Sequence, residues 1–212
     1  MKDAGSIVSV DAGVSLDEQA HGLDWVHWLL RGVRQQCEGV VLERPATKAQ
    51  MHTRWRAFVG ERFERGLGAV LIEAWHTTAR RDGPGLIKLE TTWSKMLTPD
   101  EAHRSGLAGQ LLLQRTHGAR YQGVLGHFRE DVESGRAEGH IGIVWPALAH
   151  LFQLSPVIML SEYLRLEWET AVRDLEGVAA PFGSSAIVKV AARALNPVNV
   201  SPRVLHRQQR LG

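Results

Sequence analysis

Apolar residues recur every three or four positions along most of the chain, which is the spacing of one face of an α-helix. Such stripes run through residues 23–33, 50–65 and 70–75. The longest stripe, from Val157 to Leu175, would cover about five helical turns. The hydrophobic pattern therefore predicts a chain built from successive helices.

Local capping signals mark where two of these helices begin. Residues 98–101 read Thr-Pro-Asp-Glu, which has the form of a capping box with proline at the first helical position. Ser155 and Pro156 open another helix in the same way. Glycine or proline at positions 83–85, 118, 135 and 181 then punctuates the loops between helices.

Strand signals are weak, because no alternating apolar runs are bounded by Asn-Gly turns. Residues 6–10 could form a short strand, but the sequence offers it no partner. We therefore predict an all-α fold, a compact bundle of about ten helices with short loops. A partly flexible segment at residues 1–20 precedes a single helical domain at 21–195, and residues 196–212 form a basic C-terminal tail.

The charge balance gives little support to nucleic-acid binding, since 25 Lys and Arg against 23 Asp and Glu leave a net charge of +2. A lone cysteine, Cys37, excludes a disulfide framework and fits a reducing compartment. No apolar run approaches the roughly 20 residues that a membrane helix needs. Residues 1–20 also lack a signal-peptide core. We expect a soluble, cytoplasmic protein with no membrane or nucleic-acid partner.

The familiar catalytic and cofactor signatures are missing from the sequence. It contains no GxxxxGK[ST], no GxGxxG after a strand, no HExxH and no GxSxG. Its ten histidines are scattered and show neither i, i+4 pairing nor the clustered spacing of a zinc site. Most of its seven tryptophans lie on apolar stripes, and about five are expected in the core. These absences favour a protein that is not an enzyme and holds no cofactor or metal.

One histidine stands at a distinctive place, between two glycines and just ahead of a nearly all-apolar segment. Residues 139–146 read Gly-His-Ile-Gly-Ile-Val-Trp-Pro. A helix that is apolar on every side is buried in a core or at a subunit contact. We expect His140 to be a buried neutral side chain that satisfies a nearby backbone group; a proton- or metal-responsive element is the alternative.

The order of these motifs resembles the urease accessory protein UreF family. Residues 21–26 correspond to the family's Gly-Leu-Glu-type helix start, and residues 71–76 to its apolar-Glu-Ala-Trp segment. The helix opening at Thr98, the Gly-His-apolar helix from Gly139 and the Pro-Phe-Gly turn at 181–183 follow in the family's order. The resemblance covers about residues 20–195. The sequence departs from the family pattern at residues 8–20 and at 178–184.

This resemblance implies an all-α, dimeric, cytoplasmic protein without a catalytic site of its own. Family members bridge a scaffold protein, called UreD or UreH, and the nickel-carrying GTPase UreG, and the assembly delivers nickel to apo-urease. Nickel is thus handled by the partner GTPase and by urease. Residues 196–212 carry Pro197 and Pro202 and few apolar residues, so we expect them to be loose in the free chain and ordered by a partner.

The positions that the resemblance marks for partner binding combine its motif residues with arginines suited to the acidic faces of a GTPase. They are His21, Asp24, His140, Arg165, Arg173, Gly183, Arg193, Arg203 and Arg207.

Three other interpretations remain open at the level of sequence. The chain could be a helical enzyme with a small-molecule pocket that uses His140 together with a glutamate. It could serve as an adaptor for another metalloenzyme maturation complex. It could also bind nucleic acid through Arg54, Arg56, Arg62 and Arg65, although Glu61 and Glu64 among them lower the local field.

Overall fold

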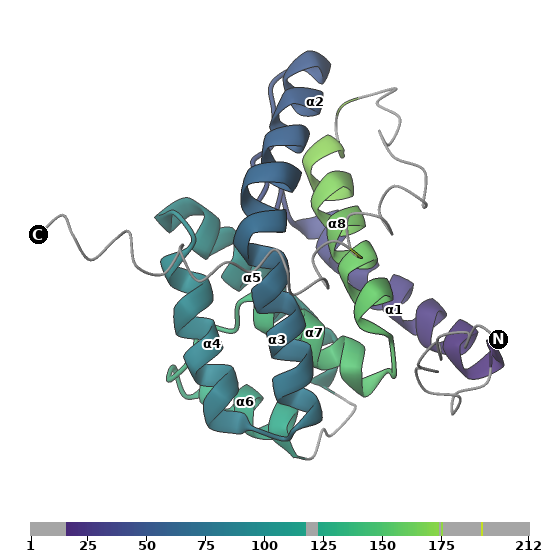
Figure 1. Ribbon diagram of the computed structural model, residues 1–212, viewed down its shortest axis with the longest axis vertical. Helices are drawn as coiled ribbons and strands as arrows, with labels where there is room; N and C mark the ends of the chain where they lie inside the picture. Colours follow the sequence, from purple (N-terminus) through teal and green to yellow (C-terminus); the bar gives the residue numbers. More distant parts are fainter. Residues whose placement is uncertain (1–15, 118–122, 174, 176–191, 193–212) are drawn as a thin grey trace, which may run out of the picture.

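The computed structural model describes residues 16–117, 123–173, 175 and 192, with side chains from Asp24 onward. Within these ranges the chain is helical, and its one isolated β-bridge joins Gly39 and Glu43. The helices are α1 (Leu16–Gln36), α2 (Lys48–Ala57), the π-helix η1 (Phe58–Leu67), α3 (Gly68–Ala79), α4 (Gly83–Lys95), α5 (Pro99–Arg115), α6 (Val124–Glu133), α7 (Ile141–Leu151) and α8 (Pro156–Val172). The predicted all-α class is confirmed (Figure 1).

The described residues contain fewer helices than the roughly ten predicted for the whole chain, in part because α2, η1 and α3 form one continuous rod. Phe58 and Gly68, at the two junctions, both have right-handed helical backbone angles. When the rod is counted as one helix, the described residues form seven helices. Hydrogen bonding in a π-helix runs from i to i+5, so each turn holds roughly one extra residue and the apolar face shifts. Because the apolar face shifts along the rod, its apolar positions form two separate stripes, at residues 50–65 and 70–75, which look like two helices in the sequence.

Side-chain caps begin the helices where the sequence predicts them. The Thr98 side chain accepts from the Glu101 N–H, and the Glu101 carboxylate accepts from the Thr98 N–H, so the predicted capping box is confirmed. Ser155 accepts from the Ile158 N–H at the start of α8. Each cap satisfies backbone donors that the first helical turn leaves without an intrahelical partner.

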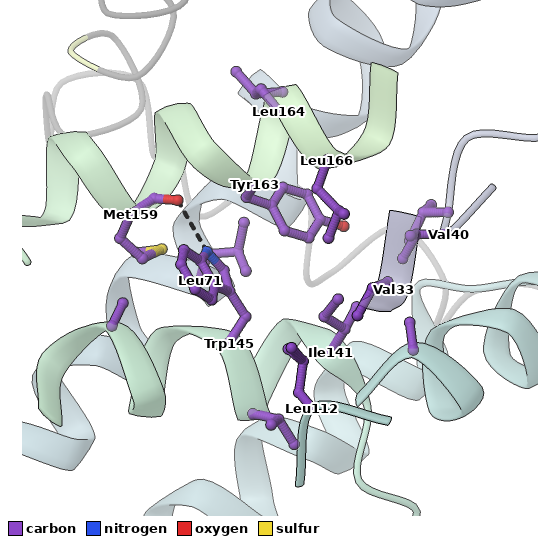
Figure 2. Close-up of a cluster of buried hydrophobic side chains, with 14 of the residues drawn as sticks. Val33, Val40, Leu71, Leu112, Ile141, Trp145, Met159, Tyr163, Leu164 and Leu166 are labelled. Atoms are coloured by element: carbon purple, nitrogen blue, oxygen red, sulfur yellow. Dashed lines mark hydrogen bonds between the residues drawn. The ribbon is translucent and has the colours of Figure 1, made fainter. Parts of the chain in front are cut away.

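The core is built around α7, which is buried from Ile141 to Ala149. Helices α3 and α5 pack against it, and α4 and α8 complete its surroundings. Figure 2 shows Trp145 of α7 donating through its indole Nε1 to the Met159 carbonyl of α8, at 3.0 Å. The prediction that this all-apolar helix is buried is therefore confirmed.

Most of the tryptophans belong to this core, as predicted. Trp55, Trp93, Trp145 and Trp168 are buried, and Trp75 is partly buried against the same cluster. The other two tryptophans, Trp25 and Trp28 on α1, are exposed.

Helix α1 packs on α5 and α8, while its N-terminal half projects past the other helices (Figure 1). Val26, Leu30 and Val33 form its buried stripe, as the sequence pattern predicts. The exposed tryptophans lie off that stripe, so they stand on the opposite side of the helix from the core. This leaves an aromatic surface on the outer side of α1.

Candidate functional site

The contact between α1 and α8 gathers charged side chains around one buried carboxylate. The side chain of Glu162 is only 9% exposed and lies close to one histidine and two arginines. His27 lies 3.4 Å away, Arg34 3.7 Å and Arg165 3.3 Å. Arg34 also pairs with Glu169. Arg165, a predicted partner-binding residue, thus lies at the edge of this network with its side chain 38% exposed.

Arg173 lies just beyond the end of α8 and reaches the end of α1. Its guanidinium donates to the Gln35 carbonyl at 2.7 Å and to the Cys37 carbonyl at 3.5 Å, and it lies 3.7 Å from Glu38. Arginine is suited to this position because the last carbonyls of a helix lack intrahelical donors. The structure therefore places Arg165 and Arg173 on the same helix pair, and it gives Arg173 a capping role as well.

The outer side of α1 carries an aromatic surface that the sequence analysis missed. Trp25 is 58% exposed and Trp28 is 44% exposed, and their rings meet edge to face with centroids 5.7 Å apart. The guanidinium of Arg115 from α5 lies 4.6 Å from the Trp28 ring centre. Asp24, another predicted partner-binding residue, is exposed one position before Trp25. The sequence did carry a signal for this exposure, because neither tryptophan lies on the apolar stripe formed by Val26, Leu30 and Val33.

His140 lies at the opposite extreme, fully buried at the N-cap of α7. Its Nε2 is 2.8 Å from the Ser94 hydroxyl and 3.0 Å from a Glu138 carboxylate oxygen. Burial lowers the pKa of His140 below its ordinary value, and the carboxylates of Glu90 and Glu138 oppose that shift without reversing it. His140 is thus the buried neutral histidine that the sequence predicts, although it bonds side chains instead of a backbone group.

The protons around His140 determine what chemistry it can perform. The single proton of Ser94 goes to the Glu90 carbonyl at 3.1 Å, so Ser94 accepts from Nε2–H of His140. The free lone pair is then on Nδ1, which is buried and without a hydrogen-bond partner among the described residues. In this tautomer His140 donates toward Ser94 and cannot withdraw its proton. The arrangement does not match a nucleophile and its base.

The carboxylate of Glu90 organises the backbone that carries His140. Glu90 is 5% exposed and accepts from the N–H groups of Glu138, Gly139 and His140 at 3.2, 2.7 and 3.0 Å. A hollow of about 490 Å³ opens beside it, lined also by Ser94 and Lys95. Six of its eight lining residues carry polar or charged side chains, whereas small-molecule sites are lined mostly by apolar and aromatic side chains. The contacts of Glu90 hold the entry to α7 in shape.

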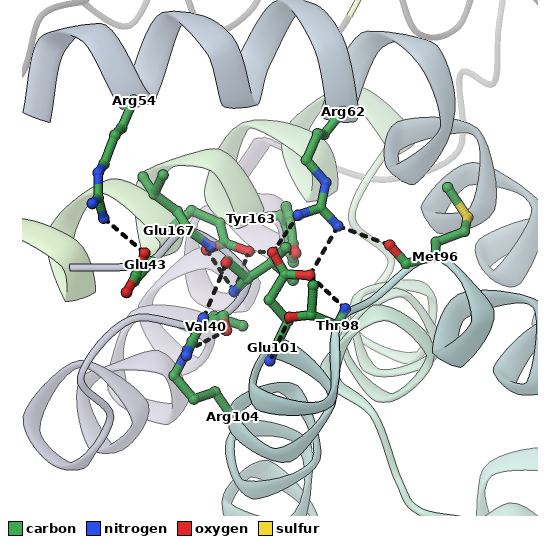
Figure 3. Close-up of polar contacts among 12 residues, drawn as sticks. Val40, Glu43, Arg54, Arg62, Met96, Thr98, Glu101, Arg104, Tyr163 and Glu167 are labelled. Atoms are coloured by element: carbon green, nitrogen blue, oxygen red, sulfur yellow. Dashed lines mark hydrogen bonds and ion pairs between the residues drawn. The ribbon is translucent and has the colours of Figure 1, made fainter. Parts of the chain in front are cut away.

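A second buried carboxylate, Glu167 of α8, fixes the connection between α1 and α2 (Figure 3). Its Oε2 accepts from the Val41 and Leu42 N–H groups at 3.0 and 2.9 Å, and its Oε1 accepts from the Tyr163 hydroxyl at 2.5 Å. Arg104 donates to the Val40 carbonyl in the same loop at 3.2 Å. This network joins α5 and α8, because side chains from both helices bind the loop that connects α1 to α2.

Burial raises the pKa of Glu167 to about 7, while the hydrogen bonds from Tyr163, Leu42 and Val41 and the charge of Arg104 oppose the shift. Sequence reasoning treated Glu167 only as a neighbour of Glu169. Its position on the apolar α8 stripe, one residue before Trp168, was the signal that it faces the core.

Two of the four arginines of the nucleic-acid interpretation, Arg54 and Arg62, pair with carboxylates within the protein. Arg62 of η1 pairs with Glu101 of α5 and donates to the Met96 carbonyl at 2.8 Å. Burial raises the pKa of Glu101, but the hydrogen bonds from Arg62 and Thr98 outweigh it and lower that pKa below its ordinary value. Arg54 donates to Glu43 at 2.8 Å. These pairs reduce the positive field that phosphate binding requires.

The remaining predicted site residues cannot be placed. Gly183, Arg193, Arg203 and Arg207 lie outside the described residues, and His21 is described only as part of the α1 backbone.

Within the described residues, no group of three or more His, Cys, Asp or Glu side chains could hold a metal ion. The helices of that part of the chain are also too short or too polar to cross a membrane. Cys37 is buried, which raises its pKa to about 11 despite the nearby Arg173.

The described residues form an all-α fold with exposed tryptophans on α1 and a network of charged side chains between α1 and α8. Comparisons of the chain with protein-family models, with curated proteins and with solved structures found no match.

Proposed function

We propose that this protein is a non-catalytic accessory protein of the UreF type. It bridges a UreD/UreH-type scaffold and a UreG-type GTPase, as a homodimer, so that nickel carried by the partners reaches apo-urease. The observation that carries the proposal is the order of the family-like motifs on one all-α chain. Residues 71–76 lie on α3, the Thr98 capping box opens α5, and Gly139 and His140 precede the buried α7.

The two polar centres support a role in binding instead of catalysis. The single Nε2–H of His140 is shared between Ser94 and Glu138, and Glu90 has its carboxylate occupied by three backbone N–H groups. Glu167 is likewise occupied by two backbone N–H groups and Tyr163. Carboxylates so fully committed to internal hydrogen bonds hold helices together and are poorly placed to act on a substrate.

The charged end of the α1–α8 pair is the surface proposed for the GTPase. Arg165 and Arg173 both lie there with partly exposed guanidinium groups. Arginine forms paired, charge-assisted hydrogen bonds with carboxylates, which suits an acidic protein face. Binding one nucleotide state of the GTPase more tightly than the other would shift its population and so time the release of nickel.

Co-purification tests this proposal directly. The full chain is co-expressed with the scaffold and GTPase from a urease maturation system of its own genome, and both are expected to be captured. The double variant Arg165→Gln, Arg173→Gln keeps hydrogen-bond donors but loses two charges, and should capture the GTPase roughly tenfold less well while retaining the scaffold.

The matched control is Arg136→Gln, an exposed arginine paired with Asp131 away from α8. It should leave both captures unchanged. A folded wild-type chain that captures neither partner would overturn the proposed function. A double variant that still captures the GTPase at the wild-type level would overturn the role of the two arginines.

A further inference from the structure

The exposed side of α1 carries large aromatic residues between two opposite charges. Asp24, Trp25, Trp28 and Arg31 are all exposed, whereas Val26, Leu30 and Val33 are buried on the other side. At 100° per residue, Asp24, Trp28 and Arg31 lie within a narrow sector of one helix face. We call these four residues the α1 ridge.

The aromatic side chains of the α1 ridge are held in place before any partner arrives. Trp28 lies under the Arg115 guanidinium, at 4.6 Å, and meets Trp25 edge to face. Arg115 is anchored in turn by donating to the Trp28 carbonyl at 3.3 Å. Large apolar side chains that are both fixed and exposed are typical of binding hot spots, since little rotamer entropy is lost on association.

The charges of the α1 ridge indicate which kind of partner would bind to it. Asp24 and Arg31 are separated by two helical turns, about 10.5 Å. If a second α1 helix lies antiparallel across the first, Asp24 of each copy faces Arg31 of the other, and Trp28 lies next to the two-fold axis. A second copy therefore supplies the complementary charge pattern automatically, as an isologous interface requires.

We propose that the α1 ridge binds a second copy of this chain, with the two α1 helices antiparallel. The proposal gives a position to the homodimer that the proposed function includes, and it rests on that function to this extent. Its physical basis is the ridge itself: an aromatic centre, where the Arg115 guanidinium lies against Trp28, and opposite charges at the ends.

The exposed area indicates a weak dimer. A buried tryptophan contributes roughly 200–250 Å² of surface, so two that are about half exposed offer on the order of 250 Å² per copy. Stable interfaces bury about 1,200–2,000 Å² in total. The tryptophans alone therefore cover less than half of a stable interface, and association is expected to depend on protein concentration.

Sedimentation velocity of the full chain over a series of concentrations tests the pairing. Asp24→Arg and Arg31→Asp each place like charges opposite one another at both ends, so each should weaken self-association roughly tenfold or more. The double variant carrying both changes restores opposite charges within its own dimer and should recover wild-type self-association. It should not pair with the wild-type chain.

Trp28→Ala should abolish the dimer, while Leu107→Ala, which truncates an exposed leucine of α5, should leave it intact. Circular dichroism checks that every variant is folded. A wild-type chain that stays monomeric at all concentrations, or a double charge variant that does not recover, would overturn the pairing.

Partner capture, measured on the same variants, separates this proposal from the proposed function. If the wild type and the double charge variant both dimerise but capture neither scaffold nor GTPase, the pairing is supported and the proposed function fails. If the single charge variants and wild type are all monomeric and yet capture both partners, the pairing and the homodimer fail, while the bridging role of the proposed function is supported.

Discussion

At the scale of single residues, Glu167 shows how a buried carboxylate can organise a helical protein. It is fully buried on α8 and satisfies two backbone N–H groups of the α1–α2 connection. Leaving those amides without an acceptor would cost about 1–3 kcal/mol each. The charge itself is costly at that depth, so the same side chain stabilises a loop and makes stability depend on pH.

The pH dependence has a definite sign. Because the folded-state pKa of Glu167 is raised to about 7 from 4.5, its contribution to stability is full below pH 4.5 and is lost as pH rises through 7. Between pH 5 and pH 8 this loss amounts to about 2–3 kcal/mol. Glu167→Gln keeps an acceptor for the two N–H groups and cannot ionise, so it should lack this loss.

Urea denaturation at pH 5 and pH 8 measures the difference, with the wild type and the variant compared at each pH so that other titrating groups cancel. Glu169→Gln, on the partly exposed neighbour that pairs with Arg34, is the control and should follow the wild type. If Glu167→Gln and wild type lose the same stability between the two pH values, Glu167 is not the group responsible.

At the scale of helices, close approach between backbones fixes how α5 packs on α7. A Cβ atom added at Gly109 of α5 would collide with the Gly139 carbonyl and lie 2.7 Å from the Ile141 nitrogen. Neither backbone atom can move without shifting the start of α7. Only glycine therefore permits this approach.

Gly109→Ala should therefore destabilise the protein by about 2 kcal/mol or more, because an overpacked core must shift backbone. In thermal unfolding this corresponds to a midpoint lowered by about 4–8 °C. Gly60→Ala is the matched control, because nothing lies within 4 Å of a Cβ added there. Its higher helix propensity should leave the midpoint unchanged or raise it slightly. Equal midpoints for the two variants would contradict the packing argument.

The helices were predictable because their signals are local. The Thr98 and Ser155 caps and the α7 apolar run involve residues a few positions apart, and all three appear as predicted. The π-helix was not predictable, since its shifted face resembles a break between helices. The contacts of Glu90 and Glu167 span 48 to 126 positions, so only the fold reveals them.

At the scale of the whole molecule, the helices share one hydrophobic core. Trp55, Trp93, Trp145 and Trp168 belong to a single cluster, although they lie on α2, α4, α7 and α8. A protein that holds two partners at fixed positions needs such a body, because a loosely jointed one would not fix their separation. One shared core is also the condition for cooperative unfolding.

Unfolding of the described helices should therefore be a single transition. Tryptophan fluorescence reports on the core and far-ultraviolet circular dichroism reports on the helices, and in urea the two should give the same midpoint. The double variant Trp25→Phe, Trp28→Phe removes the exposed fluorophores of α1, so the remaining signal comes from buried or partly buried tryptophans. Separate midpoints in this variant would mean that part of the helical structure unfolds independently of the core. The α1–α8 pair would then be the first part to examine, because the surfaces proposed for the GTPase and for the second copy both lie on it. A bridge between partners requires that this helix pair remain fixed to the core.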